Sequence, residues 1–428
     1  MIRRRVFGAL AVTILAAACG GGAPAAVQAT ATPSPSASPQ PDYEVWVPDQ
    51  AETSPTGGGT LHVFRSADLL KGSSAPAVTI NLAEAALGVG DGMGKHPHNI
   101  GFDPQRTHAV IAYVGSGHVQ VMRVRDQKIV ASFKMSGGPG GAAATHNTAV
   151  TPARDAIIVA NQGAKKLQRI SADFANDLYK VDAAAELDLT PLEDAGHPSN
   201  NPVMALFSAD GSYAYVPMRG GGAYTVDYKS TPMRVIATLT KNDIGPQSCC
   251  AILAADGSIW TTAQGGPTST TTSFNLYRVT GLPNQPVAKR VLARTGNVES
   301  HSLAFVGQYL WVVDRFANTL DVLDAKSEEI VGKVDLTTGP LAGHDAAPDI
   351  LDLAPDGKTA FLTLRGKAPV TSNIKGLDNA VGDVGGFAIL KILDAGRGGE
   401  VSSIIALPMG AGAATVDPHG LRVRAPVK

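Results

Sequence analysis

A unit of four short strands that repeats along the chain is the strongest constraint on its fold. The first clear copy runs from His98 to Met135, with turn residues such as Asp103-Pro104 and Gly115-Ser116-Gly117 between its β-rich runs. Alternating apolar residues predict the strands, and glycine, proline and aspartate predict the tight turns. Four strands in about 40 residues make one blade of a β-propeller.

Five further copies follow when one apolar residue in each first strand is aligned. The aligned residues are Phe102, Val150, Phe207, Leu253, Phe305 and Leu353. The segment 417–423 matches one more first strand, and three strands near the front (43–48, 60–65 and 77–82) lack such a partner. Pairing the two chain ends removes exposed sheet edges. We therefore expect an all-β fold, a seven-bladed β-propeller closed by one C-terminal strand beside three N-terminal strands.

The N-terminal residues are typical of an exported lipoprotein. Arg3–Arg5 precede the apolar run Val6–Ala18, whose thirteen residues are too few for the about 20 that span a bilayer. Ala16-Ala17-Ala18-Cys19 resembles a bacterial lipoprotein cleavage site, at which Cys19 would carry the lipid. A plain secretory signal is the alternative. The arginines leave open whether the general secretory or the twin-arginine route is used.

The sequence therefore divides into three parts. Residues 1–19 form a signal peptide with a lipobox, 20–42 form a disordered tether rich in Ala, Pro, Ser and Thr, and 43–428 form the propeller. We expect a monomer on the cell envelope, outside the cytoplasm and attached to the membrane by its lipid.

The charge of the exported chain argues against nucleic acid as a partner. Removal of Arg3–Arg5 from the 36 basic residues leaves 33 against 37 acidic ones, a net charge of −4. A nucleic-acid-binding protein would carry a basic stripe. We expect the partners to be a small anionic ligand or an envelope protein.

Several repeats resemble a known family. The run 159–163 (VANQG) followed by 167–170 (LQRI) resembles the YVTN repeat of bacterial and archaeal surface-associated propellers, as do 312–314, 319–324 and 330–334. Pro418-His419-Gly420 is similar to the start of such repeats. The resemblance covers nearly the whole mature chain and implies the propeller fold, but no particular activity, because such folds host many functions.

The first residue of each innermost strand is expected to lie at the mouth of the central channel, on the face where one blade connects to the next. In blade order these residues, called here the channel ring, are His419, His98, His146, Val203, Cys249, His301 and Asp349. Six of the seven belong to metal-ligating types. His96, His197 and His344 lie in loops predicted on the same face. A structural role, in which each histidine caps the preceding loop, is the alternative.

Imidazole ligands suit copper and zinc. We predict that at least three of the four ring histidines bind one such ion, with Asp349 or water completing the coordination. Cys249 is a further candidate ligand, and we expect a wide mouth that leaves one coordination position open. His108 and His118 should lie away from the ring.

A second column, where the second strands end, is predicted on the same face. It holds Ser116, Gln162, Arg219, Gln264, Arg315 and Arg365. Its three arginines and two glutamines are candidates for binding an anionic or carbonyl-bearing ligand. The alternative is that the arginines pair with neighbouring carboxylates such as Asp314.

Cys249 and Cys250 are adjacent in an exported chain, where disulfides persist. They predict either a vicinal disulfide or a thiolate metal ligand at Cys249. The insertion 367–385 between two strands is long enough to be functional, either as a lid or as a loop without a role.

Three functions remain open from the sequence. The first is a binding protein for a metal or small ligand. The second is a metal-dependent enzyme similar to lactonases or lyases, with Asp349 or Glu299 as its base. The third is a metal-free interaction platform. The chain has no phosphate-binding loop, nucleophile elbow or CxxC pair, so we expect no nucleotide cofactor.

Overall fold

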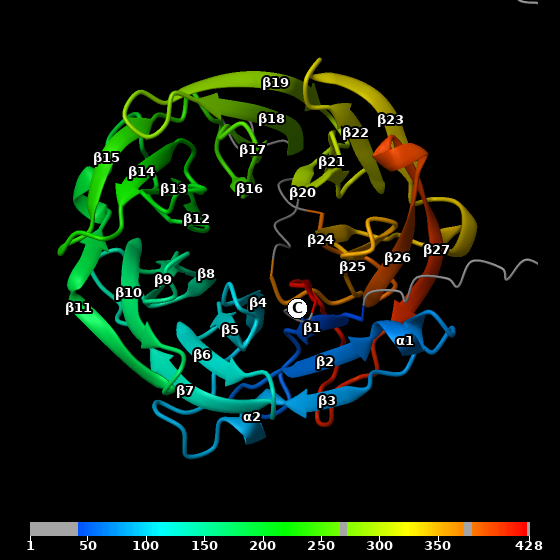
Figure 1. Ribbon diagram of the computed structural model, residues 1–428, viewed down its shortest axis with the longest axis horizontal. Coiled ribbons are helices and arrows are strands. Elements are labelled where there is room, and N and C mark those ends of the chain that lie inside the picture. The colour runs from blue at the N-terminus through cyan, green and yellow to red at the C-terminus, as the bar shows by residue number, and fades with distance from the viewer. Residues whose placement is uncertain (1–41, 266–271, 372–378, 426–428) are drawn as a thin grey trace, which may run out of the picture. The chain divides into compact units, whose positions relative to one another are not determined.

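Seven four-stranded antiparallel sheets are arranged in a ring in the computed structural model (Figure 1). The structure describes residues 42–265, 272–371 and 379–425. The predicted signal peptide, Cys19 and nearly all of the predicted tether lie outside these residues. The predicted all-β, seven-bladed propeller is confirmed.

Each blade is a meander of four neighbouring strands. Blade 1 consists of β28 (Arg422–Arg424), β1 (Glu44–Asp49), β2 (Thr60–Arg65) and β3 (Val78–Asn81). Blade 2 has β4 (Pro97–Phe102), β5 (His108–Tyr113), β6 (His118–Arg123) and β7 (Lys128–Lys134), and blade 3 has β8 (Thr145–Val150), β9 (Ala156–Asn161), β10 (Lys166–Asp173) and β11 (Leu178–Asp188). Blade 4 has β12 (Leu206–Phe207), β13 (Ala214–Pro217), β14 (Ala223–Asp227) and β15 (Arg234–Leu239).

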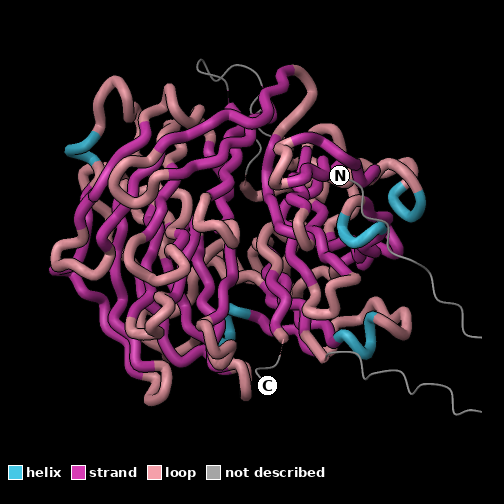
Figure 2. Tube along the Cα trace, turned by 45° about the horizontal axis from the view of Figure 1, so that its top comes forward, coloured by secondary structure: helices cyan, strands magenta, loops and turns pink. Residues whose placement is uncertain are grey.

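The remaining blades follow the same order. Blade 5 has β16 (Ser248–Leu253), β17 (Ile259–Gly265), β18 (Thr272–Thr280) and β19 (Val287–Thr295), and blade 6 has β20 (Ser300–Val306), β21 (Tyr309–Asp314), β22 (Thr319–Asp324) and β23 (Glu329–Asp335). Blade 7 has β24 (Pro348–Leu353), β25 (Thr359–Leu364), β26 (Gly386–Leu393) and β27 (Gly398–Ala406). The described helical segments are short turns in connections, among them α1 (Ser66–Leu69) and α2 (Leu82–Ala85) (Figure 2). No helix in the described part of the chain is long and apolar enough to cross a bilayer.

The two ends of the described chain meet in blade 1. Strand β28 pairs antiparallel with β1, so that Val423 lies opposite Val45. An isolated antiparallel bridge between Asp49 and Pro418 continues this pairing at the last residue of β1. The predicted closure by one C-terminal and three N-terminal strands is confirmed.

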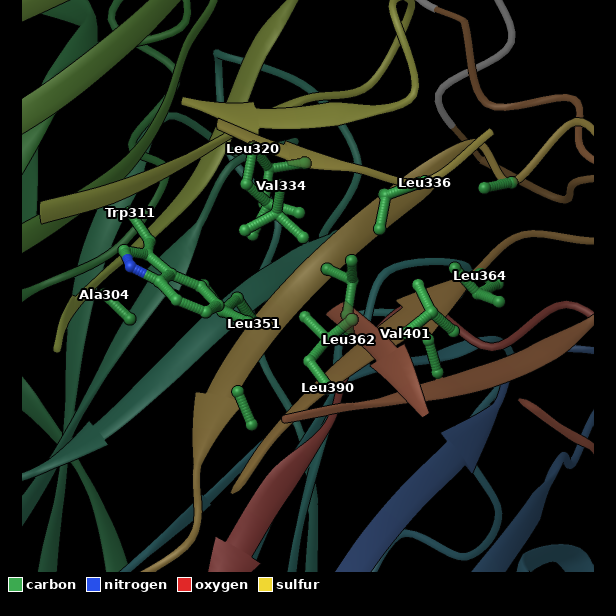
Figure 3. Packing of buried hydrophobic residues seen from close by; sticks show 14 of the residues in the cluster. Ala304, Trp311, Leu320, Val334, Leu336, Leu351, Leu362, Leu364, Leu390 and Val401 are labelled. Carbon is green, nitrogen blue, oxygen red and sulfur yellow. The ribbon is translucent and has the colours of Figure 1, made fainter. Parts of the chain in front are cut away.

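The core lies between the blades. Because each blade is covered on both faces by its neighbours, residues on both sides of a strand are buried, as in the run Val110–Tyr113 of β5. The cluster between blades 6 and 7 joins Trp311 of β21 to Leu351 of β24 and Leu362 of β25 (Figure 3). Each fully buried leucine of this kind contributes about 1.5–3 kcal/mol. These contacts hold the innermost strands in place around the channel.

Candidate metal site in the central channel

Five channel ring residues are the second residues of their innermost strands, close to the predicted position, whereas Val203 and His419 precede β12 and β28. In five blades the strand register shifts at the ring residue, which is the mark of a β-bulge. A bulge re-aims a side chain locally, and here it accompanies the turn of the ring residues toward the axis. All seven ring residues are buried, with exposed fractions of 0–6%. The expected wide mouth is therefore wrong.

Three ring histidines share one hydrogen-bonding pattern. Nδ1 of His146 donates to the carbonyl oxygen of Val203 across 2.8 Å, and Nδ1 of His419 donates to that of His98 across 3.0 Å. Nδ1 of His301 lies 3.3 Å from the carbonyl oxygen of Asp349. Each acceptor belongs to the ring residue of the next blade. Because a carbonyl oxygen only accepts, Nδ1 carries the proton and Nε2 is the nitrogen left for a ligand.

His98 also carries its proton on Nδ1, but it donates to a side chain instead of a backbone carbonyl. Its Nδ1 donates to Oε1 of Gln50 across 2.8 Å, while its buried Nε2 has no partner among the described residues. Its ring stacks on that of His419, with centroids 3.7 Å apart, and lies edge-on to that of His146 at 4.6 Å. The ring therefore brings these three imidazoles into contact.

Burial sets the charge of these rings. Burial lowers the pKa of His98 and His419 well below the usual range, and that of His146 to about 3. All three are neutral at physiological pH, which is the form that binds metals. Nε2 of His146 accepts from Arg219 across 3.4 Å, so its lone pair is already engaged.

His301 differs because a carboxylate lies beside it. Nδ1 of His301 is 2.9 Å from Oδ1 of Asp349. Burial acts to lower the pKa of His301, but the negative charge of Asp349 above all, with Cys249 as a smaller influence, raises it to about 10. An ion that binds Nε2 would thus displace a proton.

Two groups of side chains have ligand atoms within 4.8 Å of one another. The first is His301, Asp349 and His419, and the second is Cys249, Cys250 and His301. In the first group, Nε2 of His419 lies 3.8 Å from Oδ2 of Asp349. Ligands about 2.0–2.3 Å from a tetrahedral zinc ion are about 3.3–3.8 Å from each other, so both groups are near the size that one ion requires. His98 and His146 lie outside both groups, and the number of histidines on one ion stays a prediction.

Above the ring, toward the face where the innermost strands begin, lies a buried layer of ion pairs. Nη1 of Arg365 lies 2.6 Å from Oδ2 of Asp349, and its Nε lies 2.7 Å from Oδ1 of Asp417. Arg315 pairs with Glu299 and reaches Asp349 at 3.5 Å. The described ends of the predicted insertion cover this layer, because the backbone amides of Val370 and Asn379 donate to Asp417 and Glu299. Whether the insertion acts as a lid stays a prediction, since residues 372–378 lie outside the described residues.

This layer changes the roles of several predicted residues. Arg315 and Arg365 pair with carboxylates, which is the alternative role that the sequence left open for these arginines. The partners are not Asp314, which the sequence suggested, but Glu299, Asp349 and Asp417. Burial acts to raise the pKa of Asp349, but the positive charges around it, that of His301 above all, hold it well below its usual range. Asp349 is therefore a permanent anion, suited to a cation and poorly suited to proton abstraction.

The other residues of the second column have separate environments. Arg219 lies against His146, and among the described residues no carboxylate pairs with it. The side-chain amide of Gln264 and Nε2 of Gln162 are buried without a described partner. Ser116 accepts a hydrogen bond from the backbone amide of Lys95 and thus holds a loop.

Five of the six histidines outside the ring have carboxylate or loop partners, and the sixth, His62, contacts Thr79 of β3. His96, His197 and His344 pair with Glu52, Asp194 and Asp383 respectively, and His108 pairs with Asp177. His118 contacts Ser116. The prediction that His108 and His118 lie away from the ring is confirmed.

Cys249 and Cys250 are both free thiols. Their sulfur atoms are 2.9 Å apart, compared with about 2.05 Å in a disulfide. The predicted disulfide is not formed in this structure, and its formation under oxidising conditions stays a prediction. Burial raises the pKa of the Cys249 thiol well above its usual value.

A cavity of about 300 Å³ lies in the channel below the ring, away from the ion-pair layer. The ring residues His146, Cys249 and His419 line it together with later residues of the innermost strands, such as Ile252 and Leu351. A second cavity, of about 480 Å³, continues to the ends of these strands. The two share the lining residues Asn99, Asn147, Met204, Asp352 and Arg422. The ring therefore opens toward the face opposite to the predicted one, because buried ion pairs fill the predicted mouth.

Sequence reasoning missed Gln50, Asp417 and Thr371. Gln50 donates to Asp417 and Thr371 and accepts from His98, so it links the ring to the layer above it. Asp417 precedes the ring residue His419 by two positions, which is a signal that the repeat alignment could have used. Gln50 directly follows β1, the second strand of blade 1, and so occupies the second-column position of that blade, a signal that the alignment could also have used. Thr371 lies in the insertion and carries no such signal.

No family model and no curated protein matches the chain. Among solved structures, a hypothetical selenium-binding protein from Sulfolobus tokodaii is 12% identical, with a TM-score of 0.62 over 90% of this chain and 94% of that one. A protein from Lactobacillus plantarum is 11% identical, with a TM-score of 0.59 over 89% and 99%. The periplasmic gluconolactonase PpgL of Pseudomonas aeruginosa is 14% identical, with a TM-score of 0.56 over 90% and 100%. At such identities the likeness shows the fold, and the chain is a seven-bladed β-propeller of the architecture that these proteins share.

Proposed function

We propose that this protein is a lipid-anchored β-propeller outside the cytoplasm that binds one transition-metal ion in its central channel. The observation that carries the proposal is the repeated hydrogen bond from a ring histidine to the next blade. At His419 this bond fixes the proton on Nδ1 and leaves Nε2 beside Asp349 for a ligand, which is how metal-binding histidines are oriented by their surroundings. At His146, Nε2 already accepts from Arg219.

His301, Asp349 and His419 are the best-supported ligands, because their ligand atoms lie within 4.8 Å of one another. His98, whose buried Nε2 has no described partner, is a candidate for a fourth position. Two imidazoles and a carboxylate fit zinc or copper better than magnesium, which prefers oxygen ligands.

Metal analysis of the purified full chain tests the proposal. After treatment with a chelator and reloading with Zn²⁺ or Cu²⁺, we expect about one ion per chain that resists buffer exchange. His419→Gln should lower this content strongly. His344→Gln is the matched control, because His344 is exposed and pairs with Asp383. A wild-type protein that is folded and retains neither ion would refute the proposal and favour a metal-free interaction platform.

A metal-dependent enzyme, similar to a lactonase or a lyase, is the second candidate function. The cavity beside the ring favours it, because it offers space for a small substrate next to the proposed ion. Against it, the two candidate bases are engaged by arginines, Asp349 by Arg365 and Glu299 by Arg315. Turnover of a lactone that disappears both when the metal is removed by a chelator and in the variant His301→Gln would establish the enzyme. A metal-loaded protein that turns over no lactone would favour the binding function.

The anchor and the family rest on sequence. The apolar run before Cys19 supports a lipoprotein signal, and residues 20–42 would hold the propeller away from the membrane. The repeats at 159–170 and 312–334 support membership of the YVTN group. Possible partners remain a small anionic ligand, for which Arg219 is the available arginine, or an envelope protein.

A further inference from the structure

Cys249 and Cys250 are adjacent residues whose side chains approach each other. In a regular strand, neighbouring side chains point to opposite faces. Here the register of β16 shifts between Ser248 and Ala251, where one extra residue forms a bulge. Across this bulge the two sulfur atoms are 2.9 Å apart.

The same two residues line the channel cavity. Cys249, Cys250 and Met204 belong to its wall, so three sulfur-containing side chains line one cavity of about 300 Å³. His301 and Asp349 are absent from this wall among the described residues, so the thiols are the more accessible part of the ligand cluster.

His301 connects the thiols to the carboxylate. Its Nε2 lies 3.1 Å from Sγ of Cys249, whereas its Nδ1 faces Oδ1 of Asp349. A histidine with a carboxylate behind it is oriented to ligate through its other nitrogen. The nitrogen that faces the sulfurs is therefore the one that Asp349 supports.

We propose that Cys249, Cys250 and Nε2 of His301 form a thiol subsite, on the cavity side of the ring, for a soft ion of which Cu(I) is the best fit. The subsite rests on the proposed metal-binding function and specifies which ion the channel prefers. Two sulfurs and one imidazole suit Cu(I), while the nitrogen and carboxylate group of His301, Asp349 and His419 suits Zn²⁺ or Cu²⁺. Each thiol that ligates releases its proton to solvent as the metal–sulfur bond forms, and His301 releases the proton on Nε2 as the metal–nitrogen bond forms, so no oxidant or reductant is consumed.

Competition titrations test the subsite. The reduced full chain is titrated under anaerobic conditions with Cu(I), and separately with Zn²⁺, against a colorimetric chelator. In the double variant Cys249→Ser/Cys250→Ser, the affinity for Cu(I) should fall more than about 100-fold, beyond the loss expected for a second-shell change. Zn²⁺ affinity should fall much less. The matched variant His419→Gln, which alters only the other group, should show the opposite order.

A second measurement needs no substitution. Wild-type protein loaded with Cu(I) under anaerobic conditions should show a thiolate-to-copper charge-transfer band in the ultraviolet, which is lost when the thiols are alkylated beforehand. Three results would overturn the subsite: a double variant that binds Cu(I) as tightly as the wild type, an equal loss of affinity for Cu(I) and Zn²⁺, or the absence of this band. If zinc binding by wild type persists in those cases, the proposed function stands without the subsite. A wild-type chain that binds neither Cu(I) nor Zn²⁺ overturns both.

Discussion

Nδ1 of His419 donates a hydrogen bond to the carbonyl oxygen of His98 across 3.0 Å. The two residues are far apart in the sequence, yet they lie near the starts of neighbouring innermost strands, β28 and β4. The bond lies beside the bridge between Asp49 and Pro418, through which the C-terminal segment meets β1. The segment that closes the propeller thus also closes the ring of imidazoles.

The first prediction concerns this closure. Leu421 is buried in the cluster between blades 7 and 1, so Leu421→Ala should lower the free energy of unfolding by about 2–5 kcal/mol. Met409 is 59% exposed, and Met409→Ala should change it by less than about 0.5 kcal/mol. Deletion of residues 417–428 should abolish cooperative unfolding of the whole domain. Urea unfolding followed by circular dichroism measures all three, and equal stabilities would contradict the closed ring.

The second prediction concerns the buried ion pairs. Asp349→Asn removes the carboxylate that faces Arg315, Arg365 and His301, and should destabilise the metal-free protein by about 3–5 kcal/mol. The exposed pair Lys391–Glu400 provides the control, since Glu400→Gln should cost less than about 1 kcal/mol. Chemical unfolding in the presence of a chelator separates this effect from loss of metal. Comparable effects of the two substitutions would show that the layer is not fully buried in solution.

The third prediction is a pH dependence that originates at Asp49. Burial raises the pKa of Asp49 to about 7, against hydrogen bonds from the backbone amides of Asp417 and Ala51, which lower it. The charge of Asp417 raises this pKa further, and that of Arg365 lowers it. The unfolded chain loses this proton near pH 4. Between about pH 4 and 7 the folded state therefore holds a proton that the unfolded state has released, and stability falls as the pH rises through this window.

Asp49→Asn removes this titration. From pH 5 to pH 8 the wild type should lose roughly 2–3 kcal/mol of stability relative to the variant. Asp210 serves as the control, because its pKa is lowered to about 2 and its contribution changes only below about pH 4. Asp210→Asn should follow the wild-type curve between pH 5 and 8. Parallel curves for Asp49→Asn and the wild type would rule out Asp49 as the source.

The fourth prediction tests the anchor. Two acyl chains hold a protein stably on a membrane, whereas one binds only marginally. Replacement of Cys19 by serine should move the protein from the membrane fraction to the soluble fraction, with its fold unchanged because residue 19 precedes the described strands. Immunoblots of the two fractions, with and without detergent, give the measurement. A wild-type protein that is already soluble would favour the plain secretory signal.

The strands could be predicted closely because their signals are local. Alternation and turn residues place the first strand at 43–48, and the structure has Glu44–Asp49. Aligning the repeats also located the ring, since equivalent positions in a closed array must surround one axis. The signal was weakest in blade 4, where only Leu206 and Phe207 pair as an innermost strand.

The environment of the ring was beyond the sequence. Arg365 pairs with Asp417, which lies 52 positions away, and Gln50 reaches Asp417 over 367 positions. Such contacts join side chains that are far apart in the sequence. The spacing of residues within one repeat does not determine which of these side chains meet. This is why the sequence predicted an open mouth where the structure has ion pairs. It is also why the sequence did not decide whether the arginines bind a ligand or pair with carboxylates.

The position of the closing strand determines at which stage of its synthesis the protein can close the propeller and complete the proposed metal site. The residues that complete blade 1, and His419 with them, are among the last to be made. A chain interrupted before residue 417 lacks both the strand that seals the ring and one of the proposed ligands. Such a fragment would have an open sheet edge and only part of the proposed site. Incomplete chains would thus bind metal weakly. Their open sheet edge and reduced stability would also expose them to proteases.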